Sequence, residues 1–264
     1  MTMLPFTQVD AFAHAPFTGN PAAVMPLDAW LDDDVLQGIA AENNLAETAF
    51  TVPLPESAGA DYELRWFTPA VEVALCGHAT LASGHVLMSP EQPSIRFRTR
   101  KAGDLAVMRE GDGYALDLPA WEVAPTRRPN LPALLGGAEP LEVHWRDGGY
   151  LLLLYADEAQ VRALQPDFAS LGALGDILTI ATAPGRDTDI VSRVFAPGAG
   201  IDEDPVTGSA HALLTPYWAE RLGQNEFTAY QASPRGGHVG CRLEGERVIL
   251  SGQCRTVIEG RFFL

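Results

Sequence analysis

The sequence has few cysteines, with three in 264 residues: Cys76, Cys241 and Cys254. So small and odd a number, with no CxxC pair, excludes a disulfide framework and indicates reduced thiols. The amino-terminal residues contain no basic segment, and the longest strongly apolar run, Leu151 to Leu154, has the length of a strand. These absences predict a soluble, cytoplasmic protein.

Basic residues are also scarce, with 18 Lys and Arg against 34 Asp and Glu, a net charge of −16 and a pI near 4.6. Nucleic acids and anionic membranes require clustered cations, so both are excluded as partners. The six histidines show no HxxxH or HxH spacing, and GxGxxG, Walker and G-x-S-x-G motifs are absent. The sequence therefore predicts no metal and no cofactor.

One phrase occurs twice, about 130 residues apart. The first copy is Arg65-Trp66-Phe67-Thr68-Pro69 with Cys76-Gly77-His78-Ala79, and the second is Arg193-Val194-Phe195-Ala196-Pro197 with Thr207-Gly208-Ser209-Ala210. Each copy predicts a short strand, a proline-marked loop, a small-residue turn and an amphipathic helix. The two halves of the chain should therefore have similar structures.

The predicted fold is α+β, with two lobes that each form a curled, mostly antiparallel sheet around a central helix. The lobes are predicted at residues 1–118 and 119–264, with a last strand that can return to the first lobe. The central helices are predicted at 79–88 and 210–222, although Pro216 should kink or delay the second. A further helix is expected at 28–44, a β-meander at 95–118, and a Pro- and Gly-rich seam at 119–140.

Gly77 and Gly208 lie where the two central helices should begin. A helix start presents unpaired N–H groups with partial positive charge, which suit a carboxylate. Two such starts that face each other would bracket a small anionic substrate. The alternative is an ordinary tight turn, with Ser209 or Thr207 as the N-cap of the second helix.

Three motifs, Asn43–Phe50, Cys76–Thr80 and Glu203–His211, resemble those of the PhzF-like (phenazine biosynthesis-like) isomerase family. Phe12, the turn at Gly19-Asn20-Pro21 and the closing Gly260-Arg261-Phe262 also match, so the resemblance extends over nearly the whole chain. It implies the diaminopimelate epimerase-like fold. It also implies a cofactor-independent isomerase that moves a proton on a small carboxylate-bearing substrate.

The resemblance assigns the acid/base role to Glu47. This carboxylate stands among apolar residues at the start of a predicted strand, where burial would disfavour its charged form, as a group that takes and gives a proton requires. The resemblance also implies that His78 and Asp204 assist catalysis. For His78 the helix dipole favours a neutral hydrogen-bond donor. Substrate-binding residues would be Asn20, Cys76, Gly77, Gly208 and Ser209.

Alternatives remain open at these positions. Without the resemblance, Glu47 would be interpreted as a solvated loop residue and His78 as a structural histidine. Epimerases of the same fold use a cysteine before Gly in both repeats. In this sequence Thr207 occupies the position in the second repeat that Cys76 occupies in the first, and a threonine hydroxyl is too weak an acid for that proton exchange. The alternative functions are an epimerase or racemase that uses Cys76 with another partner, and a non-catalytic small-molecule binding protein. A homodimer also remains open.

Overall fold

The computed structural model describes residues 2–127 and 131–264, which form two compact units. Unit 1 extends to Leu118 and includes Leu250–Leu264, whereas unit 2 is Pro119–Ile249. The sequence placed the boundary between residues 118 and 119 and allowed a last strand to return to the first lobe; Leu250–Leu264 is the segment that returns. Part of the predicted seam, residues 128–130, lies outside the described residues.

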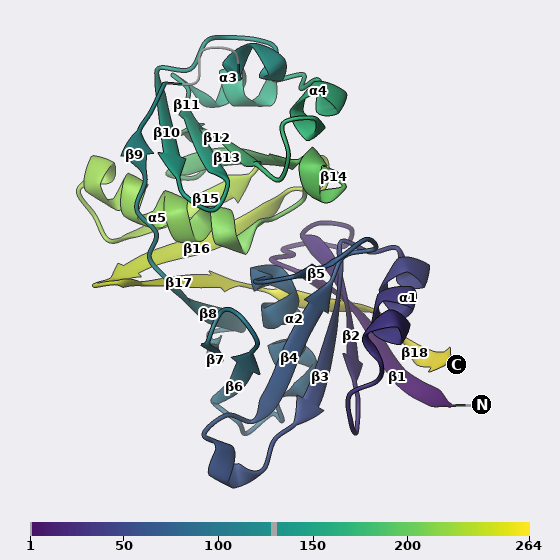
Figure 1. Cartoon of the computed structure of the whole chain (residues 1–264). Helices are drawn as coiled ribbons and strands as arrows, with labels where there is room; N and C mark the ends of the chain where they lie inside the picture. The colour runs from purple at the N-terminus through teal and green to yellow at the C-terminus, as the bar shows by residue number, and fades with distance from the viewer. Residues whose placement is uncertain (1, 128–130) are drawn as a thin grey trace. The chain divides into compact units, whose positions relative to one another are not determined.

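Unit 1 contains the elements of the first repeat and the last strand of the chain (Figure 1). They are β1 (Met3–Ala11), β2 (Asn20–Pro26), α1 (Asp33–Asn43), β3 (Glu47–Pro53), the 3-10 helix η1 (Glu56–Ala58), β4 (Tyr62–Phe67), β5 (Glu72–Val73), α2 (Gly77–Leu87), β6 (Ser94–Thr99), β7 (Asp104–Glu110), β8 (Gly113–Pro119) and β18 (Cys254–Phe263). Strand β1 pairs antiparallel with both β18 and β2. From β2 the sheet continues through successive pairs. Strand β2 pairs parallel with β3, β3 antiparallel with β4, and β4 parallel with β6. Strand β7 then pairs antiparallel with both β6 and β8.

Unit 2 repeats this plan. Its elements are β9 (Ala124–Pro125), η2 (Pro132–Leu135), β10 (Glu142–Arg146), β11 (Tyr150–Leu154), α3 (Glu158–Arg162), α4 (Phe168–Gly172), β12 (Leu178–Pro184), β13 (Ile190–Ala196), η3 (Pro197–Ala199), β14 (Ile201–Asp204), α5 (Gly208–Leu222), β15 (Glu226–Gln231) and β16 (Gly237–Glu244). From β10 to β16 the pairings are antiparallel, parallel, antiparallel, parallel and antiparallel, the succession found from β1 to β7. Strand β17 (Arg247–Gly252) extends across the boundary between the units. The predicted α+β class is confirmed, with a mixed sheet.

Helix α2 is buried over most of its length and contacts strands β1, β2, β3, β7 and β18. Its residues are mostly small, which allows strands to approach from several sides. A Cβ at Gly84 would lie 2.5 Å from Val107 Cγ1, so this glycine is required by the close approach of β7. The predicted helix 79–88 is thus confirmed, although it begins two residues earlier.

Helix α5 is buried to a similar degree and continues through Pro216, which neither delays nor ends it. A proline lacks the N–H that would bond to the carbonyl four residues earlier, here Ala212 O. The backbone N–H of Trp121 donates to that carbonyl across 3.1 Å. The acceptor that Pro216 leaves free is therefore satisfied from another segment, and the helix tolerates the proline.

The arginine of the repeated phrase has the same structural role in both units. Arg65 donates through Nε and NH2 to Glu72 across 2.8 and 2.9 Å, and its guanidinium lies 4.9 Å from the Phe67 ring centroid. Arg193 donates in the same way to Glu203, at 2.8 Å for both contacts, and lies 5.0 Å from the ring of Phe195. Glu72 and Glu203 each stand four residues before a helix N-cap, so each pair fixes the segment that leads to a helix start.

The remaining sequence expectations are largely met, with shifted boundaries. Helix α1 begins at Asp33 instead of residue 28, and the meander appears as β6, β7 and β8. Strand β15 (Glu226–Gln231) was not predicted. Within the described residues, the helices are too short or too polar to cross a membrane.

Two glycine substitutions test the close packing of α2. We expect Gly84→Ala to lower the free energy of unfolding by about 1–3 kcal/mol, because overpacking outweighs the gain in helix propensity. The matched control is Gly38→Ala in α1, where nothing lies within 4 Å of the new Cβ. It should stabilise the protein by about 1 kcal/mol. Urea unfolding measures both changes, and equal effects would contradict this account.

Two arginine substitutions test the buried ion pair. Arg65 is 2% exposed and Arg98, which binds Asp104 in the same two-pronged way, is 42% exposed. Arg65→Met should cost about 3 kcal/mol, because it leaves carboxylates without their buried partner. Arg98→Met should cost less than about 1 kcal/mol. Thermal unfolding of the two variants gives the comparison, and a larger loss for Arg98→Met would refute the role of burial.

Candidate active site

Glu47 is the first residue of β3 and follows a tight connection from α1. The helix ends at Asn44, which adopts the left-handed conformation with φ 49° and donates its N–H to Ala40 O. The side chain of Asn43 donates to Thr48 Oγ1 across 3.1 Å and ties the helix to the strand. Glu47 is therefore held on both sides, and its side chain is 12% exposed.

Cys76 and His78 lie at the start of α2. Cys76 is the N-cap and has an extended backbone conformation. The carbonyl of Cys76 accepts from Thr80, through the backbone N–H at 3.2 Å and the hydroxyl at 2.6 Å. The side chains of Cys76 and His78 are consequently fixed on a closed and buried helix turn.

Asn20 holds the imidazole of His78 from the opposite side, with its Nδ2 lying 3.0 Å from His78 Nδ1. It is fully buried at the start of β2 and follows Gly19, which has φ 76°. A Cβ at Gly19 would lie 2.3 Å from Ala11 O, so only glycine fits this turn. The turn predicted at Gly19-Asn20-Pro21 therefore delivers Asn20 to the imidazole.

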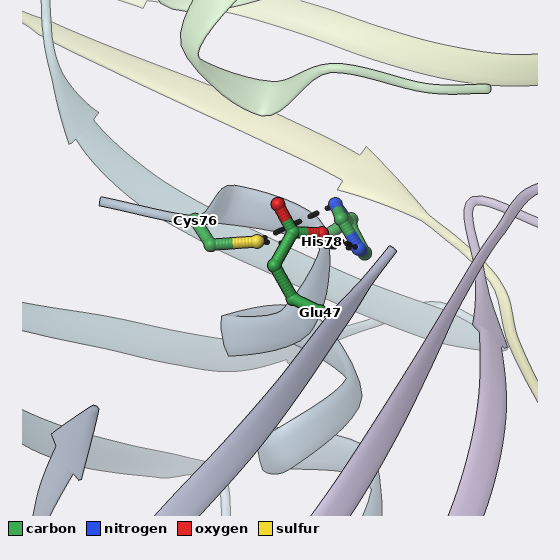
Figure 2. A group of neighbouring side chains, drawn as sticks. All are labelled: Glu47, Cys76 and His78. Atoms are coloured by element: carbon green, nitrogen blue, oxygen red, sulfur yellow. Dashed lines mark hydrogen bonds and ion pairs between the residues drawn. The ribbon is translucent and has the colours of Figure 1, made fainter. Parts of the chain in front are cut away.

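The side chains of Glu47, Cys76 and His78 gather at one point (Figure 2). His78 Nε2 lies 3.0 Å from Glu47 Oε2, and Cys76 Sγ lies 3.5 Å from His78 Nδ1 and 4.0 Å from Nε2. The contact between Nε2 and Oε2 has the distance of an ion pair. Among the described residues, no donor other than His78 lies within reach of the buried Oε2. A buried carboxylate whose Oε2 has only the imidazole as a partner is thus placed beside a thiol.

Burial and the charge of Glu47 raise the pKa of the Cys76 thiol to about 11. The thiol is therefore neutral near pH 7. Burial alone lowers the pKa of His78, but the neighbouring Cys76 and Glu47 raise it, and the net direction is upward. Because the thiol is neutral, Glu47 is the anion that favours the imidazolium. This differs from the neutral His78 expected from the helix dipole, because a carboxylate 3.0 Å away outweighs a partial charge.

The second unit has a different set of side chains at its helix start. Thr207, the N-cap of α5, donates its hydroxyl to Asp204 Oδ2 across 2.5 Å. Gln231 of β15 accepts the Thr207 N–H at 2.9 Å and donates to Asp204 O at 2.6 Å. All three residues are buried. The hydroxyl proton of Thr207 is thus engaged, and the loop before the helix is fixed by a buried amide.

Gly208 and Ser209 are the first residues of α5, and neither Thr207 nor Ser209 caps the helix through its side chain. Ser209 instead hydrogen-bonds the hydroxyl of Tyr150. His211 is fully buried, and its Nδ1 lies 2.8 Å from Thr207 O. Burial lowers the pKa of His211 to about 4. His211 is therefore neutral and donates from Nδ1 to Thr207 O, as the hydroxyl of Thr80 donates to Cys76 O in α2.

The site residues predicted from the sequence fall into two groups. In unit 1 the structure brings together Asn20, Glu47, Cys76, Gly77 and His78, and in unit 2 it brings together Asp204, Gly208 and Ser209. The sequence analysis missed Gln231. Along β15 every second residue is buried, and the last buried position is Gln231. A search for strand-like alternation in the sequence would therefore have indicated this strand and its inward-facing glutamine.

Comparison with known proteins supports the family that the motifs of this site indicate. The family model of phenazine biosynthesis-like proteins matches residues 9–260. The chain belongs to this family. An uncharacterized isomerase of Pseudomonas aeruginosa is 49% identical over 265 residues, which cover 99% of each chain. The human phenazine biosynthesis-like domain-containing protein is 38% identical over 283 residues, which cover 97% of this chain and 98% of its relative.

Solved structures place the fold in the same family. A phenazine biosynthesis protein of the PhzF family from Enterococcus faecalis has a TM-score of 0.91 and 44% identity, with both chains fully covered. A hydroxyproline epimerase from Agrobacterium vitis has a TM-score of 0.62 at 11% identity, which shows a shared fold alone. The PhzF-like chain thus has an epimerase-like fold, and curated family members carry the name isomerase.

The charge on Glu47 can be tested as the cause of the raised pKa of His78. In the unmodified protein the imidazole should titrate above its usual range. In Glu47→Gln the anion is gone and burial remains, so the pKa of His78 should fall below its usual range. NMR titration of the imidazole ring measures both values.

The control for this titration is Cys76→Ser, which should leave the pKa of His78 raised, because the thiol that it replaces is neutral near pH 7. A pKa that falls in Cys76→Ser but not in Glu47→Gln would show that sulfur supplies the charge.

Proposed function

We propose that the protein is a cofactor-independent isomerase that moves a proton on a small carboxylate-bearing substrate, with Glu47 as the proton shuttle. The observation that carries the proposal is the buried carboxylate of Glu47, whose Oε2 has only His78, 3.0 Å away, as a partner among the described residues. General acid–base catalysis requires a carboxylate that can take a proton and return it. The family, whose members are named isomerases, supports this reaction class.

The proton balance of the proposed step is simple. Glu47 removes a proton from a substrate carbon, becomes a carboxylic acid, and leaves the electron pair delocalised over the substrate. It then returns the proton to a different carbon, which shifts the double bond and restores the carboxylate. His78 Nε2, 3.0 Å from Glu47 Oε2, orients the carboxylate between turnovers.

The substrate carboxylate has donors at the helix start. The N–H groups of Gly77 and His78, in the first turn of α2, have no partner within the helix and adjoin the three side chains. In unit 2, the start of α5 at Gly208 and Ser209 offers donors of the same kind. We propose that Asn20, Cys76, Gly77, Gly208 and Ser209 bind substrate and that Asp204 assists catalysis.

Two-base racemisation is the second candidate, and the chemistry at both helix starts disfavours it. Cys76 has a pKa raised to about 11 and is a poor base near pH 7. Thr207 occupies the corresponding position and donates its proton to Asp204. A single carboxylate shuttle needs neither group as a base.

Candidate substrates are identified by the increase that they cause in the melting temperature of the protein. Small cyclic and amino-acid carboxylates are screened, and a ligand that binds only the native state should raise the melting temperature. At a ligand concentration 100 times Kd the stabilisation is about 2.7 kcal/mol. The corresponding uncharged amide of each hit is the control and should stabilise less. Equal stabilisation by amides would contradict the carboxylate subsite.

The shuttle is tested with a substrate from this screen in D₂O. Deuterium should appear at the carbon that receives the proton. Glu47→Gln keeps the size but removes the base, so turnover should fall by at least ~10²-fold. The matched control is Glu42→Gln, an exposed residue of α1, which should retain turnover.

Cys76→Ala separates the two mechanisms. It should reduce turnover much less than Glu47→Gln does, because the neutral thiol transfers no proton in the proposed step. If Cys76→Ala abolishes deuterium exchange and Glu47→Gln does not, the reaction uses the thiol and the assignment of Glu47 is wrong. Stabilisation by a ligand without any deuterium incorporation would favour a binding protein.

A further inference from the structure

We propose that Glu47, Cys76 and His78 also form a binding site for a thiophilic divalent cation, Zn²⁺ or Co²⁺, and that the bound ion inhibits the enzyme. The sequence predicted no metal, because the three residues do not share a recognisable spacing. In the structure, however, one ligand atom of each lies within 4.8 Å of the others, and all three residues are buried (Figure 2).

The distances require only small movements of the side chains. In a tetrahedral zinc site with ligand bonds of about 2.0–2.3 Å, neighbouring ligand atoms are roughly 3.3–3.7 Å apart. The observed separations are 3.0 Å from His78 Nε2 to Glu47 Oε2 and 4.0 Å from His78 Nε2 to Cys76 Sγ. Three protein ligands leave a fourth position for water.

The donor set and its charge suit a borderline-soft dication. Sulfur, nitrogen and oxygen together favour Zn²⁺ or Co²⁺ over Mg²⁺ and Ca²⁺, which prefer oxygen ligands. The Glu47 carboxylate and the Cys76 thiolate together neutralise the two positive charges, so the buried site carries no unpaired charge. Binding releases the thiol proton and any proton on the ligating nitrogen of His78.

Asn20 provides the outer support that a ligating histidine usually has. Its amide lies 3.0 Å from His78 Nδ1. With Nε2 on the metal, Nδ1 carries the proton and donates to the amide oxygen after the amide rotates by half a turn. In unit 2 the positions of Cys76 and His78 are occupied by Thr207 and Ser209, so that helix start lacks the thiol and imidazole ligands.

Inhibition by the ion rests on the proposed function, because a metal-bound Glu47 oxygen cannot accept a substrate proton. Binding of the ion does not rest on it. The two are therefore measured separately, first by spectroscopy without substrate and then by turnover.

The binding test uses the full chain after EDTA treatment and removal of the chelator. Titration with Co²⁺ should give one site per chain and a thiolate-to-cobalt charge-transfer band, which Zn²⁺ abolishes by displacement and excess Mg²⁺ does not. Cys76→Ser should remove the band, and Glu47→Gln should weaken Co²⁺ binding at least ~10-fold. Cys254→Ser is the matched control and should keep the band, because its thiol lies outside the cluster.

Circular dichroism checks that each variant is folded, and His78→Asn provides a second variant that should weaken binding. The site is refuted if no charge-transfer band appears up to millimolar Co²⁺. It is also refuted if Cys76→Ser retains the band. In the turnover assay, Zn²⁺ should inhibit and EDTA should restore the rate, whereas Co²⁺ binding without inhibition would refute the inhibitory role alone.

Discussion

Each unit of this protein depends on the burial of most of one helix, α2 in unit 1 and α5 in unit 2. A helix with strands on several sides cannot use water to satisfy its polar groups, so the structure supplies partners from within. Thr80 and His211 bond back to the carbonyls of the two N-caps, and Trp121 supplies the donor that Pro216 lacks for the carbonyl of Ala212. The same constraint explains Gly84, where only a hydrogen atom fits beneath β7.

Burial of the helix also explains the chemistry at its start. A charged residue in this region is costly unless an opposite charge is close, and Glu47 and His78 meet that condition for each other. Cys76 shares the same region and remains a thiol, because both burial and the neighbouring carboxylate oppose its ionisation. In unit 2 the equivalent space holds Thr207, Asp204 and Gln231, which satisfy one another by hydrogen bonds. The two units therefore have different sets of side chains at equivalent helix starts.

Much of the fold could be predicted from the sequence, because the repeated phrase specifies the same succession of strand, loop, turn and helix in each half of the chain. The helix stop at Asn43-Asn44 was visible because asparagine tolerates the left-handed conformation that Asn44 adopts. The contact of Glu47 with His78 could not be derived from spacing, since it joins β3 to α2 across 31 positions, and only the family resemblance indicated it. Nor could the fate of Pro216 be predicted, because its missing donor is replaced by a residue almost a hundred positions away.

The arginines of the repeated phrase have the same structural role in both units. They are Arg65 and Arg193, in a chain with net charge −16. In the structure each guanidinium makes a bidentate contact with a carboxylate of the same unit and lies beside an aromatic ring. Backbone N–H groups at the starts of α2 and α5 also carry partial positive charge, which acts at short range. The arginines contribute indirectly, because Glu72 and Glu203 fix the segments from which α2 and α5 begin.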